Sequence, residues 1–299
     1  MTRLALVLLL ATAAPALADK TADASYKEGL AYKQEGKIDD AIKAMEEATA
    51  TNPKHLMAWS SLGAMYKQKK DYPKSIEAYE HATQLLPANP SDKKSAAVLW
   101  SNLGGAYANS SVQKYDQALV ALQTACKLDP TDANTRALLG SVQRKKGDNA
   151  GAITNLEIAV KAQPSNADWQ HNLGVAYRFA KRDDDAIKAF NAAIAINGND
   201  PVYHFDLAVV YRRKQDPDHA IPEYEKATSL DPANADGWFD LGFMYKENHE
   251  NDKAIDAMKH YLDLKKGKDP EGEKRVTDEC QAMGGCKDDS KKKPTPKKK

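Results

Sequence analysis

The chain has 299 residues, and its 43 lysine and arginine residues nearly balance 42 aspartate and glutamate residues, for a formal net charge of +1. This balance argues against a protein that binds nucleic acid over its whole surface. Aromatic residues make up only 7% of the chain while alanine is plentiful, and this composition favours helices over sheets.

The first 18 residues have the pattern of a secretory signal peptide. Arg3 gives a short basic start, residues 4–14 form an apolar run, and Ala16-Leu17-Ala18 has the A-x-A form of a cleavage site. An uncleaved anchor is the alternative, but the run is shorter than the roughly 20 residues that a membrane-spanning helix needs. We therefore expect an exported protein without a transmembrane segment, periplasmic in a bacterium or else secreted, whose mature chain begins near Asp19.

A motif of eight residues recurs along the rest of the chain. It reads Trp59-x-x-Leu62-Gly63-x-x-Tyr66 and returns in full from Trp100 and from Trp238. A partial copy, Gly29-x-x-Tyr32, opens the series, and weaker copies lie between Trp100 and Trp238. Each copy is followed by a small residue, then by a large residue four places on, and in five copies a proline comes later. The small residues are Ala41, Ser75, Ala118, Ala152, Ala186, Ala220 and Ala254, and the large ones are Met45, Tyr79, Leu122, Leu156, Phe190, Tyr224 and Met258.

This pattern resembles the tetratricopeptide repeat, and the resemblance covers residues 22–268. In this register the seven repeats are 22–55, 56–89, 97–132, 133–166, 167–200, 201–234 and 235–268. The resemblance implies an all-α, right-handed superhelical solenoid of seven helix-turn-helix repeats, in which helix A and helix B of each repeat pack closely at the small residues. Residues 90–96 are an insertion, and Ser91 or Asp92 is expected to cap a lengthened helix A there.

After the last repeat, residues 269–286 predict a capping helix and a cysteine pair. Asp269-Pro270-Glu271 is typical of a helix start, and the helix is expected over 270–283. Cys280 and Cys286 flank the turn that follows, and in an exported protein they form either a disulfide or two free thiols. No metal site is expected, because the pair lacks further ligands nearby. Cys126 is interpreted as a small, buried apolar residue.

The last 13 residues, 287–299, hold seven lysines and two aspartates, whereas residues 19–286 carry 35 basic and 40 acidic residues. The sequence therefore predicts a mildly acidic body with a disordered basic tail. Two interpretations of the lysines at 291–299 are open: a tether to an anionic envelope surface, or a solubilising extension.

In tetratricopeptide repeat proteins the A helices line a concave groove, so the resemblance implies a ligand groove here. The twelfth position of the repeat is basic in six of the seven repeats, at Lys33, Lys67, Arg144, Arg178, Arg212 and Lys246. These cations would bind acidic side chains, a terminal carboxylate or peptide carbonyls. Alternatively, they complement the dipoles of their own helices.

Three more positions of the repeat are expected to face the ligand. The sixth position holds Asn102, Asn172, Asp206 and Asp240, and an amide there would match the donor and acceptor of a peptide bond. The fifth and ninth positions become aromatic or apolar toward the C-terminus, at His171, Phe205, Phe239 and Phe243. These rings form either a binding pocket or a packing surface for the capping helix. A partner is expected to engage the fourth to seventh repeats.

The sequence therefore predicts a non-catalytic scaffold or adaptor that binds a peptide segment or a partner protein in its groove, outside the cytoplasm. It has no nucleophile motif, phosphate-binding loop or metal-ligand spacing, so no enzyme activity, cofactor or nucleic-acid partner is expected. The alternatives are an envelope-surface tether acting through the basic tail, and an accessory subunit of an envelope enzyme or secretion complex.

Overall fold

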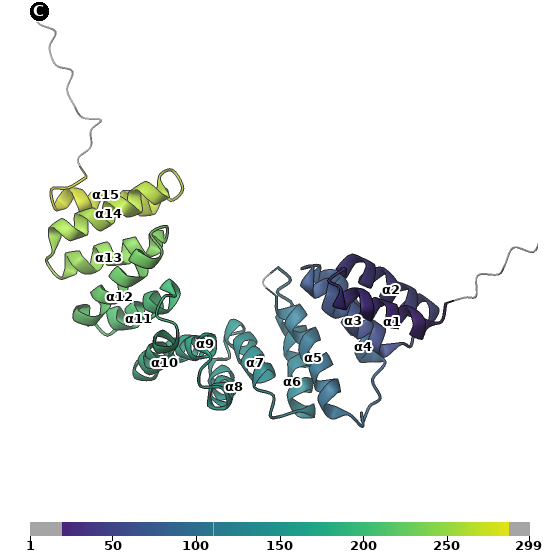
Figure 1. Ribbon diagram of the computed structural model, residues 1–299. Helices are drawn as coiled ribbons and strands as arrows, with labels where there is room; N and C mark the ends of the chain where they lie inside the picture. Colours follow the sequence, from purple (N-terminus) through teal and green to yellow (C-terminus); the bar gives the residue numbers. More distant parts are fainter. Residues whose placement is uncertain (1–19, 110, 287–299) are drawn as a thin grey trace, which may run out of the picture. The chain divides into compact units, whose positions relative to one another are not determined.

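The computed structural model describes residues 20–109 and 111–286. The signal peptide and the lysine-rich tail fall outside these residues, so both stay predictions. The described residues form 15 α-helices and no strand, which confirms the all-α class (Figure 1).

The chain divides into two compact units, the first ending at Pro130 and the second beginning at Thr131. The helices of the first unit are α1 (Ala22–Gln34), α2 (Ile38–Thr51), α3 (Leu56–Gln68), α4 (Tyr72–Gln84), α5 (Lys93–Ala108) and α6 (Tyr115–Leu128). Those of the second unit are α7 (Ala133–Lys145), α8 (Asn149–Ala162), α9 (Ala167–Phe179), α10 (Asp183–Ile196), α11 (Pro201–Arg213), α12 (Pro217–Leu230), α13 (Ala235–Glu247), α14 (Asn251–Lys265) and α15 (Pro270–Ala282).

Helices pack in consecutive pairs within each unit. Each odd-numbered helix from α1 to α13 is a helix A, and it lies against the helix B that follows it (Figure 1). Inside a unit, each helix B also packs against the next helix A, and α14 packs against α15. One pair cannot bury its apolar face alone, so each unit is held together by contacts between neighbouring pairs.

Polar side chains fix where the A helices begin. Asn166 and Asn234 accept a hydrogen bond from a backbone N–H in the first turns of α9 and α13, and Asp200 does so for α11. Helix α5 begins at Lys93, four residues before the predicted third repeat, because Asp92 within the insertion caps it. Six of the seven A helices begin at the first residue of a predicted repeat, and α5 is lengthened by the insertion.

The small and large residues of the motif meet between the two helices of a pair. A Cβ added to Gly174 on α9 would lie 2.7 Å from the ring of Phe190 on α10, and Phe190 is fully buried. The same holds for Gly63 and Tyr79, at 2.6 Å. Because protein interiors are close-packed, a side chain at the glycine position would displace the large residue.

The side chain at the tryptophan position of the motif ties several repeats to the preceding one. Trp59 Nε1 donates a hydrogen bond to the Pro53 carbonyl at 2.9 Å, and Trp238 Nε1 bonds the Pro232 carbonyl at 3.0 Å. His204 holds this position in its repeat, and its Nε2 lies 3.1 Å from the carbonyl of Gly198. The glycine that replaces proline there therefore still supplies the carbonyl.

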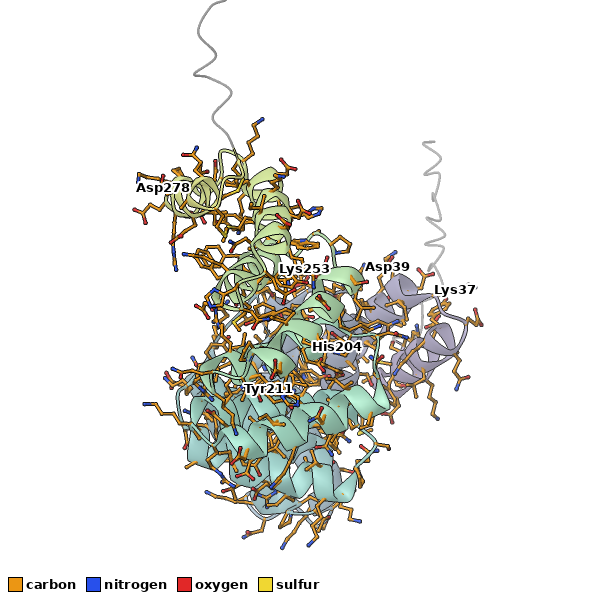
Figure 2. The ribbon with its side chains drawn as sticks, turned by 90° about the vertical axis from the view of Figure 1, so that its left-hand side faces the viewer. Lys37, Asp39, His204, Tyr211, Lys253 and Asp278 are labelled. Carbon is orange, nitrogen blue, oxygen red and sulfur yellow. A yellow bond between two sulfur atoms is a disulfide. The ribbon has the colours of Figure 1, made fainter. Side chains whose placement is uncertain are left out.

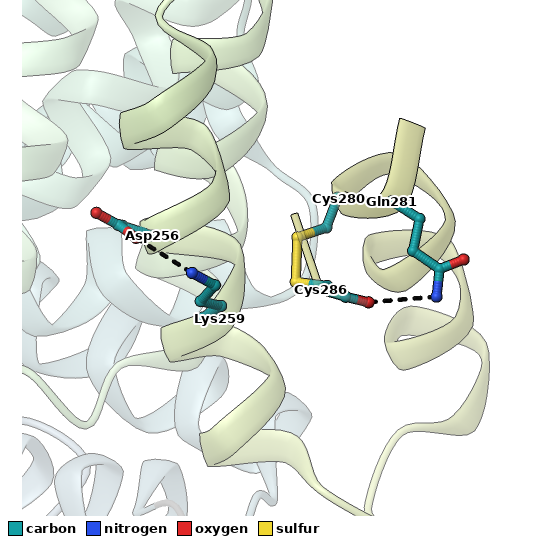
Figure 3. The surroundings of a disulfide bond; sticks show 5 residues. All are labelled: Asp256, Lys259, Cys280, Gln281 and Cys286. Carbon is teal, nitrogen blue, oxygen red and sulfur yellow. Dashed lines mark hydrogen bonds and ion pairs between the residues drawn. A yellow bond between two sulfur atoms is a disulfide. The ribbon is translucent and has the colours of Figure 1, made fainter. Parts of the chain in front are cut away.

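Helix α15 closes the second unit. Val276 and Cys280 are fully buried, and Cys280 is joined to Cys286 in a disulfide beside α14 (Figure 3). Gln281 Nε2 donates to the Cys286 carbonyl at 3.3 Å across the same turn. In the chain-entropy account, closing such a short loop stabilises a fold by about 2 kcal/mol. The helix ends at Ala282, one residue earlier than expected.

Cys126, in the first unit, is buried as expected.

Candidate functional site

The predicted groove residues are divided between the two units. Lys33, Lys67 and Asn102 lie on α1, α3 and α5 of the first unit, where both lysines are exposed and Asn102 is half-buried. The others lie on the A helices α7, α9, α11 and α13 of the second unit: Arg144, His171, Asn172, Arg178, Phe205, Arg212, Phe239, Phe243 and Lys246. In this second unit the structure brings several of them into contact with charged neighbours.

Three basic residues of the second unit form ion pairs with the next odd-numbered helix. An Nη of Arg178 lies 3.3 Å from Asp206 Oδ1, and Arg212 donates to Asp240. Lys246 pairs in the same way with Glu279 on α15. These cations therefore connect adjacent repeats, a role that the sequence analysis did not foresee. They also lie in the last turns of their helices, where a cation complements the helix dipole.

Asp206 is shared by two side chains of α9. Besides Arg178, it contacts His171, whose Nε2 lies 2.7 Å from Asp206 Oδ2. The ring of His171 stacks on Tyr203, with 4.8 Å between the ring centroids. Asp206 itself is buried, and the guanidinium of Arg178 compensates its negative charge there.

Asp240 occupies a similar buried position one repeat later. Burial raises the pKa of its carboxyl above the ordinary value, while Arg212 acts in the opposite direction. Tyr224 Oη donates to Asp240 Oδ2 at 3.2 Å, and burial raises the pKa of this tyrosine.

Arg144 is the exception among the basic residues of the second unit. The residue 28 places after Arg178 or Arg212 is an aspartate, but 28 places after Arg144 stands Asn172, which is neutral. No carboxylate among the described residues lies within ion-pairing distance of Arg144, and its Nε is buried without a hydrogen-bond partner. Burial lowers the pKa of its guanidinium, because the charged form loses water. Arg144 therefore has donors left for an anionic group.

The aromatic residues at the C-terminal end both pack and line a cavity. Phe239 and Phe243 have ring centroids 4.7 Å apart, and Arg275 of α15 lies over both rings, at 5.2 and 4.6 Å from their centroids. A cavity of about 550 Å³ opens beside Phe239 and is lined by Phe205, Asp236, Phe239, Asp240, Tyr261, Asp269, Glu271, Gly272 and Arg275.

Sequence reasoning missed the partners of the basic residues. Asp206 and Asp240 were assigned to the groove, but their pairing with the preceding repeat was not expected. The constant spacing of 28 residues was the signal for it. Arg275 and Glu279 lie beyond the repeats, where no register could show their neighbours.

Among residues 20–109 and 111–286, no three histidine, cysteine, aspartate or glutamate side chains are grouped so that they could hold a metal ion. None of the helices described combines the length and the apolar character needed to cross a membrane.

Comparisons with known families match most of the repeat region. Models described as tetratricopeptide repeat match residues 26–90, 137–201, 201–234 and 223–256, and a model described as TPR repeat matches residues 111–147. Together they match residues 26–90 and 111–256, which lie in both units.

Two curated proteins show partial similarity. Anaphase-promoting complex subunit 3 of Schizosaccharomyces pombe is 29% identical over 127 residues, which are 42% of this chain and 18% of that protein. The Hsp70-Hsp90 organising protein of Plasmodium falciparum is 31% identical over 115 residues, 38% of this chain and 20% of that protein. The chain thus spans about a fifth of the length of these relatives.

Among solved structures, the C-terminal part of a TPR repeat-containing protein from Cytophaga hutchinsonii is similar over 83% of this chain and 97% of that chain. The TM-score is 0.63 and the sequence identity 17%, so this likeness supports the fold alone.

Proposed function

Because this chain belongs to the tetratricopeptide repeat family, whose members are typically non-catalytic scaffolds for protein–protein interaction, we propose that its second unit binds an extended peptide segment of a partner protein. The segment lies across α7, α9, α11 and α13. Arg144 anchors an acidic side chain or a terminal carboxylate of this segment.

The observation that carries the proposal is the contrast between Arg144 and its counterparts. Arg178, Arg212 and Lys246 already have carboxylate partners, whereas the half-buried Arg144 has none among the described residues. The Nε of Arg144, like that of Arg178, is buried without a hydrogen-bond partner. An incoming carboxylate therefore gains a charge-assisted hydrogen bond from a guanidinium that has no carboxylate partner of its own. Asn172, on the neighbouring helix A, supplies an amide suited to a peptide bond.

The replacement Asn172→Asp tests this assignment. It places at this position the acid that the next two repeats have, so an internal carboxylate would compete for Arg144. We expect dodecapeptides selected from a random display library on the full-length protein to bind this variant about tenfold more weakly, as measured by fluorescence anisotropy. We also expect the melting temperature to stay constant or to rise.

The matched control is Asn191→Asp, which makes the same change on an exposed residue of α10 in the same repeat. It should leave the affinity unchanged. Equal binding of the peptides to wild type and Asn172→Asp, or a failure to select any peptide, would contradict the proposed role of Arg144.

We further propose that the protein works outside the cytoplasm, most simply in a bacterial periplasm. The pattern of residues 1–18 supports this, and so does the Cys280–Cys286 disulfide, since disulfides persist in oxidising compartments. Mass spectrometry of the protein from its native cells should find a mature N-terminus near Asp19. An intact N-terminus at Met1 or Thr2 would contradict export through this signal.

A further inference from the structure

The cavity between the last repeat and α15 has aromatic walls and an acidic rim. Phe205, Phe239 and Tyr261 supply rings, and four carboxylates line it together with Arg275. We propose that this cavity binds an arginine side chain of the partner peptide. The inference rests on the proposed function, and it adds a second, oppositely charged anchor to the one at Arg144.

The charge of the cavity selects a cation. Its lining carries the four carboxylates of Asp236, Asp240, Asp269 and Glu271 against the single guanidinium of Arg275. Two cations from outside the lining reduce this excess, because Arg212 pairs with Asp240 and Lys265 Nζ lies 3.5 Å from Asp236. The four carboxylates outnumber the three cations, so the surroundings of the cavity keep a net negative charge.

Two hydrogen bonds favour the ionised form of Asp269, one of the four carboxylates that line the cavity. Tyr261 Oη donates to Asp269 Oδ2 at 2.7 Å, and the Gly272 backbone N–H donates to Asp269 Oδ1 at 3.1 Å. The hydrogen bond from Tyr261, followed by that from Gly272, lowers the pKa of this carboxyl. The rim therefore stays negatively charged at neutral pH.

The rings show that a guanidinium fits here. The guanidinium carbon of Arg275 lies 5.2 and 4.6 Å from the ring centroids of Phe239 and Phe243, which is within the range of cation–π attraction. A planar guanidinium stacks on a ring while it donates to carboxylates in pairs, whereas the compact ammonium of lysine does only part of this. Arginine is therefore the side chain that uses both the rings and the acids.

The test compares two forms of one peptide on the full-length protein. Dodecapeptides selected from the display library should carry arginine at a fixed distance from an acidic residue. Replacing that arginine by citrulline, which keeps the shape and removes the charge, should weaken binding to wild type on the order of tenfold. The double variant Asp236→Asn with Glu271→Gln should reduce this ratio to near one.

The control for the double variant is Asp256→Asn with Asp278→Asn. It removes the same charge from exposed residues of α14 and α15 that do not line the cavity, and Asp278 is labelled on α15 in Figure 2. This control should preserve the arginine-to-citrulline ratio. Peptides without arginine at a fixed position, or a ratio that the cavity variant leaves unchanged, would overturn the inference. Sensitivity of the same peptides to Asn172→Asp would then show that the proposed function still stands.

The variant Arg275→Gln shows whether the cavity binds a cation or an anion. If the cavity takes arginine, this variant frees the rings and makes the lining more negative, so the arginine peptide should bind several-fold more tightly. If binding weakens instead, Arg275 is itself the contact for an acidic group, and the inference is wrong.

Discussion

Replacing Phe190 with alanine is expected to lower the free energy of unfolding of the second unit by about 3–5 kcal/mol. The side chain is fully buried between α9 and α10, where it packs against the bare backbone of Gly174. Because glycine has no side chain that could move into the space, a large cavity remains. The ring of His171, whose centroid lies 5.5 Å from that of Phe190, also loses a neighbour.

Urea denaturation followed by circular dichroism measures this loss. Phe179→Ala is the matched control, since Phe179 lies in the same repeat but is 55% exposed, and it should change stability by less than about 1 kcal/mol. A loss below about 1 kcal/mol for Phe190→Ala would contradict the packing between the small and large positions of the repeat.

Replacing Arg144 with glutamate is expected to weaken binding of the selected peptides on the order of a hundredfold. The change removes a charge-assisted contact and sets a carboxylate against the acidic group of the ligand. Stability has to be measured beside affinity, because Asp206 favours the charge of Arg144 whereas Arg178 disfavours it, and the change reverses both effects.

Calorimetric titration of the peptides measures the affinity, and thermal unfolding measures the stability. Lys161→Glu on α8 is the control, because it reverses the charge of an exposed residue in the same repeat. It should bind the peptides as wild type does. A loss of affinity shared equally by both variants would indicate a general charge effect and would contradict a specific site at Arg144.

The fold was largely predictable from the sequence because its packing rules recur at a fixed interval. The contact between Gly174 and Phe190 is repeated by the equivalent residues of most repeats. Trp59 and Trp238 likewise make the same hydrogen bond to the preceding repeat. Each constraint thus appears in several copies, and the register follows from their agreement. The longer α5 was also foreseeable, because an aspartate in the insertion could cap it.

The candidate site was less predictable because it depends on which charges meet when repeats stack. Arg144, Arg178 and Arg212 occupy the same position of their repeats. They differ only in the side chain that the next helix A places opposite them. Asn172 is the decisive difference, since it stands where the following repeats place aspartates. Arg275 contacts the aromatic residues from α15, whose position against the last repeat follows from packing and not from a register.

The central claim is that Arg144 pairs with an acidic group of a bound peptide. A charge-reversal cycle tests it most directly, by measuring the affinities of wild type and Arg144→Glu for a selected peptide and for its variant with lysine in place of the acidic residue. We expect each single reversal to weaken binding and the two reversals together to restore much of the affinity. Losses that simply add, with no recovery in the double reversal, would contradict the pairing.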